Sequence, residues 1–322
     1  MIVETRALTK QYRGKLAVDS LDLVVPEASI SAFLGPNGSG KTTTIKMLLD
    51  MVRPTSGEAL VFGEPASAVS IRERVGYVAE DKRLYGNMTV ARILEFTRPF
   101  YPEWSRDRER ILLQRFDLPL DRKVRALSKG MHSKLALVLA LSHRAQLLIL
   151  DEPGEGLDPV ANEQMLESIV EATGEGAAVF FSTHQVAEVE RIADHVFILS
   201  AGRLAFEGSL EDLRANCRRV HAVFPGRAPL EDMRLPGVRT ATADRNRLSI
   251  IADGNLETIE RRARDLGAIS VDLEPLSLRE VFLAAVAEPL AAGQPAVDAK
   301  QYLRTSAPRE SGDGEGSGAE QS

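Results

Sequence analysis

Short apolar runs alternate with longer amphipathic stretches along the first two-thirds of the chain. Short apolar runs bounded by turn residues are typical of strands buried on both faces. They predict strands at residues 30–34, 75–79, 147–150, 177–182 and 196–200. Helical periodicity lies between these runs and is clearest over Ser128–Leu141. Strands that alternate with helices predict an α/β domain with a largely parallel core sheet.

Further segments complete this first domain, which we expect to cover residues 1–215. Segments rich in β-branched residues predict more strands at 2–9, 16–25, 59–62 and 203–207. Amphipathic segments predict helices at 43–51, 89–100, 106–116, 159–173 and 185–193.

The pattern changes after residue 217. Strands are predicted at 220–224, 238–243, 247–252 and 269–273, around a helix at 256–266 and before a final helix at 278–287. We therefore expect a small α+β accessory domain over residues 216–287. The remainder, 288–322, is rich in small and polar residues and is predicted to be a disordered tail.

Composition and charge count against several classes of protein. The chain has 322 residues, a formal net charge of −6 and a single cysteine, Cys217. One cysteine excludes an intrachain disulfide and a cysteine-cluster metal site, and the acidic balance gives no reason to expect nucleic acid as a partner. No apolar run reaches the ~18 residues of a membrane span, and the first residues lack the shape of a signal peptide. We expect a protein of the cytosol, whose membrane part, if any, belongs to another chain.

A glycine-rich segment between the strand at 30–34 and the helix after it fits G-x-x-x-x-G-K-[ST] at every fixed position. A helix N-terminus directs several backbone N–H groups at one place, which favours a bound phosphate. Lys41 would reach the β- and γ-phosphates, and the Thr42 hydroxyl would bind Mg²⁺. The residues predicted to bind the nucleotide here are Gly35, Pro36, Asn37, Gly38, Ser39, Gly40, Lys41, Thr42 and Thr43. An incidental glycine-rich turn is the structural alternative.

Two carboxylates, Asp151 and Glu152, follow the apolar strand at 147–150. Nucleoside triphosphatases with such a phosphate loop place an Asp on Mg²⁺ at the end of a buried strand. We predict that Asp151 binds Mg²⁺ and that Glu152 polarises the attacking water. A solvated pair of loop carboxylates is the alternative.

The order of these motifs resembles the nucleotide-binding subunit of ATP-binding-cassette (ABC) transporters, over about residues 2–215. Leu127-Ser128-Lys129-Gly130-Met131 stands where that family has its Leu-Ser-Gly-Gly-Gln signature. The resemblance implies that Ser128 and Gly130 face the γ-phosphate held by a second subunit. It also implies a helical subdomain at about residues 86–145.

Three more site residues are implied by the resemblance. Tyr12 stands where the family stacks an aromatic ring on adenine, and Asp158 lies in the loop that crosses the dimer interface. His184 matches the histidine that contacts the γ-phosphate and orients the water. The structural alternatives are a packing aromatic at a strand end for Tyr12 and a structural histidine for His184, and for Ser128 an ordinary helix N-cap.

The sequence departs from the family pattern at three places. Glu80 replaces the usual glutamine, and its carboxylate could still bind Mg²⁺ while adding negative charge near the phosphates. Lys129 and Met131 replace Gly and Gln in the signature. Gly154-Glu155 replaces the usual Thr-Ser, which would set Glu155 near the dimer interface.

The function implied is ATP hydrolysis with Mg²⁺ that drives a separate transmembrane permease, at the cytoplasmic face of a membrane. Two such subunits, identical or unlike, would bind two ATP head to tail. The segment Glu80–Met88 would receive the permease, with Lys82, Arg83, Leu84 and Tyr85 as contacts. Pro275–Leu283 resembles the closing segment of multidrug- and polymer-type exporters, although an ordinary closing helix has the same spacing. Alternatives are a soluble ABC-type ATPase and a nucleotide-sensing regulator.

Overall fold

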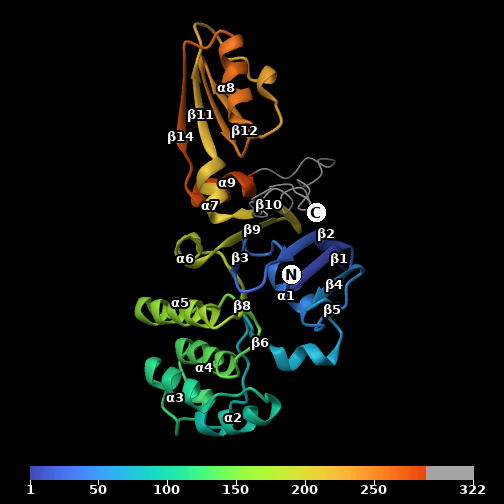
Figure 1. The fold of residues 1–322 in the computed structure, drawn as a ribbon, viewed down its shortest axis with the longest axis vertical. Helices are drawn as coiled ribbons and strands as arrows, with labels where there is room; N and C mark the ends of the chain where they lie inside the picture. The colour runs from blue at the N-terminus through green and yellow to red at the C-terminus, as the bar shows by residue number, and fades with distance from the viewer. Residues whose placement is uncertain (288–322) are drawn as a thin grey trace, which may run out of the picture.

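The computed structural model describes residues 1–287 and contains three sheets, two of them side by side and the third at one end of the long axis (Figure 1). The tail predicted at 288–322 lies outside the described residues. In the described part, no helix combines the length and the apolarity needed to cross a bilayer.

The central sheet has six strands in the order β10-β9-β3-β8-β7-β6. All neighbours are parallel except β10, which pairs antiparallel with β9. The strands are β3 (Ile30–Leu34), β6 (Val75–Val78), β7 (Leu147–Asp151), β8 (Ala178–Thr183), β9 (His195–Ser200) and β10 (Arg203–Ser209). Every residue of β3, β7 and β8 is buried, as the continuous apolar runs predict. The predicted α/β domain with a parallel core is confirmed.

The carboxyl ends of β3, β7 and β8 meet at one edge of this sheet. In the pairing register, Leu34 lies opposite Thr183 and Asp151 lies opposite Ser182. The glycine-rich segment, Glu152 and His184 each follow one of these strands by a few residues. The topology therefore brings together three segments that are far apart in the sequence.

A four-stranded antiparallel sheet packs beside the central one, in the order β2-β1-β4-β5. Its strands are β1 (Val3–Tyr12), β2 (Lys15–Val25), β4 (Ser56–Val61) and β5 (Glu64–Pro65). Helix α1 (Lys41–Leu48) shares its core, where Ile45 is buried with Phe33 of β3 and Phe180 of β8. This packing fixes the start of α1 against the end of β3.

Five helices lie on the other side of the central sheet: three of them pack against the sheet, and the other two pack on one of these and lie below it in Figure 1. They are α2 (Val90–Thr97), α3 (Arg106–Arg115), α4 (Lys129–Leu141), α5 (Pro159–Gly174) and α6 (Val186–Ile192). Side chains of Thr89, Ser105, Ser128 and Asp158 cap the first four by accepting backbone N–H bonds. The helix predicted to reach Phe100 ends at Thr97, and a 3₁₀ turn containing Pro99 follows it, because proline cannot continue the α-helical bonds.

The small unit has four antiparallel strands in the order β12-β13-β11-β14. They are β11 (Arg218–Val223), β12 (Val238–Asp244), β13 (Arg247–Ala252) and β14 (Ser270–Pro275). Helix α8 (Leu256–Asp265) covers one face, and Val220, Ile250 and Ile259 form a separate core there.

Two helices connect the small unit to the first domain. The sequence did not predict α7 (Leu210–Asn216), whose seven residues are too few for a clear period. Leu278 and Val281 of α9 (Leu278–Ala287) join the same core as Leu213 of α7 and Cys217. The last helix therefore packs with the first domain, although it follows the small unit in the chain.

Candidate functional site

The glycine-rich segment forms a tight loop between β3 and α1. Gly40 precedes α1 with φ at 113°, and Gly38 has φ at 79°, a region that favours glycine. A Cβ atom on Gly40 would lie 2.5 Å from the carbonyl oxygen of Ala17. These two glycines are therefore required by the backbone, and they leave the first amides of α1 facing open space.

A cavity of about 370 Å³ lies in front of this loop. Its lining residues are Tyr12, Lys15, Ala17, Asn37, Gly38, Gly40, Lys41, Thr42, Thr43, Glu80 and Glu152. The Tyr12 side chain lines the cavity and is 44% exposed, and Lys10 Nζ lies over its ring at 5.0 Å from the ring centre. The structure thus gathers most of the predicted nucleotide-binding residues around one cavity, whereas Ser39 is buried beneath it.

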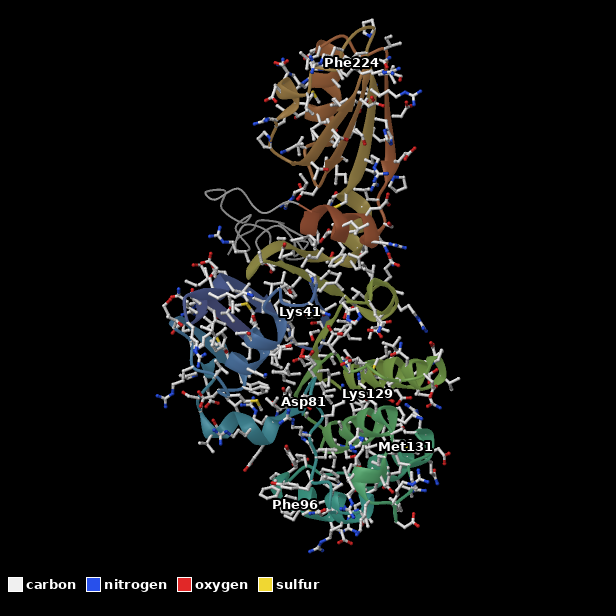
Figure 2. The ribbon with its side chains drawn as sticks, turned by 180° about the vertical axis from the view of Figure 1, so that it is seen from behind. Lys41, Asp81, Phe96, Lys129, Met131 and Phe224 are labelled. Atoms are coloured by element: carbon white, nitrogen blue, oxygen red, sulfur yellow. The ribbon has the colours of Figure 1, made fainter. Side chains whose placement is uncertain are left out.

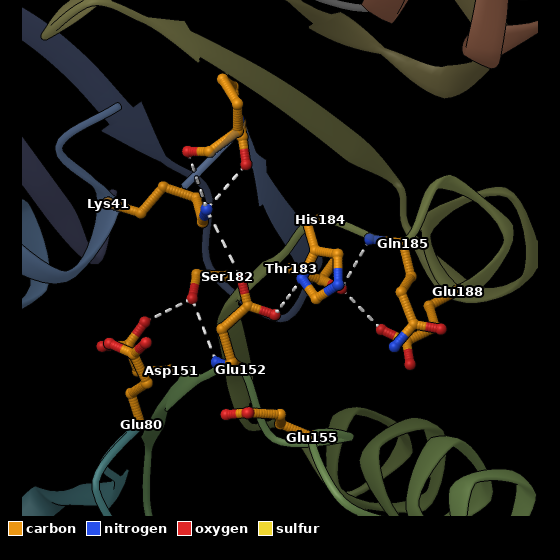
Figure 3. A network of polar contacts seen from close by, with 12 residues as sticks. Lys41, Glu80, Asp151, Glu152, Glu155, Ser182, Thr183, His184, Gln185 and Glu188 are labelled. Atoms are coloured by element: carbon orange, nitrogen blue, oxygen red, sulfur yellow. Dashed lines mark hydrogen bonds and ion pairs between the residues drawn. The ribbon is translucent and has the colours of Figure 1, made fainter. Parts of the chain in front are cut away.

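Figure 3 shows a chain of polar contacts behind this cavity, centred on Glu152. One oxygen of Glu152, Oε1, lies 3.4 Å from Lys41 Nζ, and the other, Oε2, lies 2.9 Å from His184 Nδ1. Lys41 Nζ also donates to the carbonyl oxygen of Gly35 at 2.7 Å. The carboxylate of Glu152 is therefore held between a lysine at the start of α1, after β3, and a histidine that directly follows β8.

The backbone of Glu152 is strained, and Ser182 holds it in place. Glu152 has φ at 47°, a left-handed conformation that costs energy for a residue with a side chain. Its N–H donates to both the hydroxyl and the carbonyl oxygen of Ser182, each at 3.1 Å. This strain turns the Glu152 side chain out of the strand direction and toward the loop.

Asp151 is fully buried beside Glu152. Its Oδ1 accepts a hydrogen bond of 2.5 Å from the Ser182 hydroxyl, whereas its Oδ2 has no hydrogen-bond partner within residues 1–287. Burial raises the pKa of Asp151. A buried carboxylate oxygen that accepts no hydrogen bond is able to coordinate a cation.

Thr42 and Glu80 supply more oxygens near Asp151. The Thr42 hydroxyl donates to Glu80 Oε2 at 3.1 Å. Oxygen donors of this kind suit Mg²⁺. Among the described residues, no three acidic, histidine or cysteine side chains form a closed metal cage. This donor set is therefore one that a cation would complete with phosphate oxygens and water.

Ser128, Gly130 and Asp158 do not line the cavity of their own chain. Ser128 caps α4 through its hydroxyl, which accepts from the Met131 N–H at 3.2 Å, and Asp158 caps α5 in the same way. Both cap residues are exposed. This is the arrangement expected if these residues complete the site of another subunit.

Sequence reasoning missed three contacts of the site. Ser182 orients both Asp151 and Glu152, and Lys82 Nζ donates to the carbonyl oxygen of Glu152 at 3.2 Å. Lys129 and Glu155, two of the departures from the family pattern, form an ion pair of 2.6 Å with each other. Only Ser182 carries a sequence signal, because it is a polar residue that ends a buried strand.

Comparison with known proteins settles the family. The family model described as ABC transporter matches residues 18–155. The bacitracin transport ATP-binding protein of Bacillus licheniformis is 35% identical over 223 residues, which are 68% of this chain and 73% of that protein. The chain belongs to the ABC transporter ATP-binding proteins.

Two further comparisons extend this ABC ATPase assignment. The daunorubicin resistance ATP-binding protein DrrA3 of Streptomyces coeruleorubidus is 33% identical over 292 residues, covering 85% of this chain and 92% of that protein. A solved ATP-binding subunit of an ABC transporter superposes with a TM-score of 0.62 at 31% identity, covering 67% of this chain and 92% of that one. The chain is the ATPase subunit of an ABC transporter.

Proposed function

We propose that this subunit hydrolyses Mg²⁺–ATP with Glu152 as the general base and exports a substrate through its permease. The observation that carries this proposal is the Glu152 carboxylate, which lies between Lys41 and His184 at the rim of the phosphate loop. A general base needs a fixed geometry close to the attacking water, and the bonds of the Glu152 N–H to Ser182 and of its carboxylate to Lys41 and His184 fix that geometry.

Mg²⁺ would be held by Thr42, Asp151 and Glu80, and it would offset the negative charge of the phosphates. Lys41 is poised to exchange its contact with Glu152 for the β- and γ-phosphates when ATP enters the cavity. That exchange would free the Glu152 carboxylate to accept a proton from water. His184 would then keep Glu152 oriented and contact the γ-phosphate.

A second ATPase subunit would complete the site. The exposed Ser128 and Asp158 and the partly exposed Gly130 supply a helix N-terminus and a loop that lie outside the cavity of their own chain. Two chains packed head to tail would therefore enclose each ATP between one cavity and the partner's α4. Hydrolysis would remove the γ-phosphate that links them, and the dimer would open.

The relatives favour export as the direction of transport. They include proteins named for bacitracin transport, daunorubicin resistance and Nod factor export. The Nod factor export protein of Burkholderia pseudomallei is 32% identical over 87% of this chain, so the likeness includes the small unit.

An aromatic surface on the helical part would bind the permease. Tyr85, Phe96 and Phe100 are 62%, 42% and 59% exposed, and their rings meet edge to face at 5.6 and 5.5 Å. Exposed aromatic rings in contact with one another are typical of an interface. Phe96 lies at the end of the molecule opposite Phe224, which belongs to the small unit (Figure 2). The permease and the small unit would therefore occupy opposite ends of the subunit.

Substitutions at the site test the function. Lys41→Ala should weaken ATP binding by roughly tenfold or more, because a charge-assisted contact with phosphate is lost. Glu152→Gln should keep ATP binding but lower turnover by about a hundredfold or more. Binding is measured by calorimetry and turnover by phosphate release.

Lys46→Ala is the matched control, because Lys46 is an exposed lysine on the same helix α1. It should leave both quantities unchanged. Parental turnover by Glu152→Gln would contradict the assignment of the base, and parental affinity of Lys41→Ala would contradict the phosphate site.

A further inference from the structure

The N-terminus of α4 and the loop after Glu152 are joined at a point that the proposed mechanism does not use. Lys129 Nζ lies 2.6 Å from Glu155 Oε1, and the Lys129 ammonium lowers the pKa of the Glu155 carboxyl. Lys129 follows the cap residue Ser128, and Glu155 is three residues beyond Glu152. In Figure 2, Lys129 lies among the helices, whereas Lys41 lies nearer the antiparallel sheet.

Three further contacts join the same two segments. The buried Ser133 hydroxyl of α4 donates to the Glu155 carbonyl oxygen at 2.9 Å. Gly130 packs so closely that a Cβ there would lie 2.8 Å from the Gly156 carbonyl oxygen. The methylene groups of Lys129 cross Gly156, where a Cβ would meet them at 3.0 to 3.3 Å. The lysine therefore lies flat on the loop before its ammonium reaches Glu155.

The loop leads directly from this contact to the base. The Glu155 N–H donates to the Glu152 carbonyl oxygen at 3.2 Å, which closes a turn between the two residues. A shift of Glu155 is therefore transmitted to the Glu152 backbone. The loop continues to the exposed Asp158, and α4 carries the exposed Ser128. The contact between Lys129 and Glu155 thus acts on both the position of Glu152 and the surface that would face the partner subunit.

We propose that Lys129 and Glu155 form a charge clamp that positions Glu152 for hydrolysis. Both are positioning residues, and neither is assigned a contact with ATP. This inference rests on the proposed function, because it acts through Glu152. The clamp joins two of the departures from the family pattern, because Lys129 and Glu155 carry opposite charges and lie in contact.

Charge exchange tests the clamp. The Lys129 and Glu155 side chains are 67% and 39% exposed, and an exposed ion pair contributes up to about 1 kcal/mol. Glu155→Gln and Lys129→Met should therefore each lower kcat for ATP by up to about fivefold, with KM for ATP within about twofold of the parental value. The double variant Lys129→Glu with Glu155→Lys should recover at least about half of the parental kcat, because the pair is restored with its charges reversed.

Glu171→Gln is the control. It breaks the ion pair of 2.8 Å between Arg115 of α3 and Glu171 of α5, which also joins two helices but lies away from the cavity. Its kcat should equal the parental value. Thermal melting of all variants should stay close to that of the parent, since exposed ion pairs add little to global stability.

Three results would overturn the clamp. Parental kcat in both single variants would show that the pair does not position Glu152. An inactive double variant together with an unaffected Glu155→Gln would mean that Lys129 acts directly on the partner's nucleotide. A parental chain without ATPase activity would remove the proposed function and the clamp with it, and this result is distinguishable because the parent itself fails.

Discussion

At the scale of single residues, local motifs could be predicted and long-range contacts could not. The phosphate loop and the Asp151-Glu152 pair follow from short patterns beside apolar runs, and the structure places them at one edge of the sheet. Lys82 could not be predicted, because its bond to the Glu152 carbonyl joins segments 70 positions apart. No local sequence pattern specifies the contact between Lys82 and Glu152.

Glu80 gives a prediction about metal dependence. Glu80→Gln removes one negative charge beside Thr42 and Asp151, where Mg²⁺ would bind. The Mg²⁺ concentration for half-maximal ATPase activity should rise, by roughly tenfold or less, because affinity for such cations depends on the charge of the ligands. ATP binding in the presence of a chelator should strengthen, since the phosphates meet less repulsion.

Both quantities are measured on purified protein, the first by phosphate release against free Mg²⁺ and the second by calorimetry. Glu103→Gln, at an exposed position outside the cavity lining, is the control for a lost surface charge. An unchanged Mg²⁺ dependence would place Glu80 outside the metal site.

At the scale of elements, the predicted strands and most helices agree with the structure because each is long enough to show its period. Two predictions differ from the structure. The sequence did not predict α7, which has only seven residues, and α2 ends earlier than predicted because Pro99 cannot continue the helix. The exposed rings of Tyr85, Phe96 and Phe100 could not be recognised as one surface from sequence, because they come together only when α2 and the preceding segment fold.

This surface predicts a separation of two activities. Phe96→Ser should lower transport and permease-stimulated ATPase activity by about fivefold or more, since buried aromatic anchors dominate interfaces. The basal ATPase activity of the isolated subunit should not change, because Phe96 lies outside the cavity. Both activities are measured in vesicles that contain the permease and in solution.

Ile111→Ser is the matched control, because Ile111 is an apolar residue that is 48% exposed on a different helix, α3. Loss of stimulation in Ile111→Ser as well as in Phe96→Ser would show that the effect is not specific to the aromatic surface.

At the scale of the whole molecule, the sequence grouped α9 with the small unit, and packing places it elsewhere. Leu278 and Val281 share a core with Leu210, Leu213 and Cys217, whereas Val220, Ile250 and Ile259 form the core of the small unit. Amphipathic spacing predicted a buried face on α9 correctly. It could not specify which core receives that face, since both cores accept apolar side chains equally well.

The packing of α9 predicts an effect on stability. Leu278 is 3% exposed, and Leu278→Ala should lower the free energy of unfolding of the first domain by about 2–4 kcal/mol, because it removes buried methyl groups and leaves a cavity. Leu283→Ala is the control, since Leu283 lies on the same helix and is 55% exposed. Urea unfolding is followed by a probe in the first domain.

Equal stability of the two variants would show that α9 does not support the first domain. A loss confined to the small unit, measured by a probe placed there, would assign α9 to that unit instead.

The bond between the Leu276 N–H and the Cys217 carbonyl oxygen, at 3.4 Å, has a consequence for the architecture. This bond places the two ends of the segment 218–275 side by side. Helix α7 precedes the segment in the chain, and α9 follows it. The small unit is thus, in topological terms, an insertion into a continuous ATPase fold. We therefore expect that a short bridge between Cys217 and Leu276 could close the first domain without the small unit, and that another domain with adjacent termini could occupy its place.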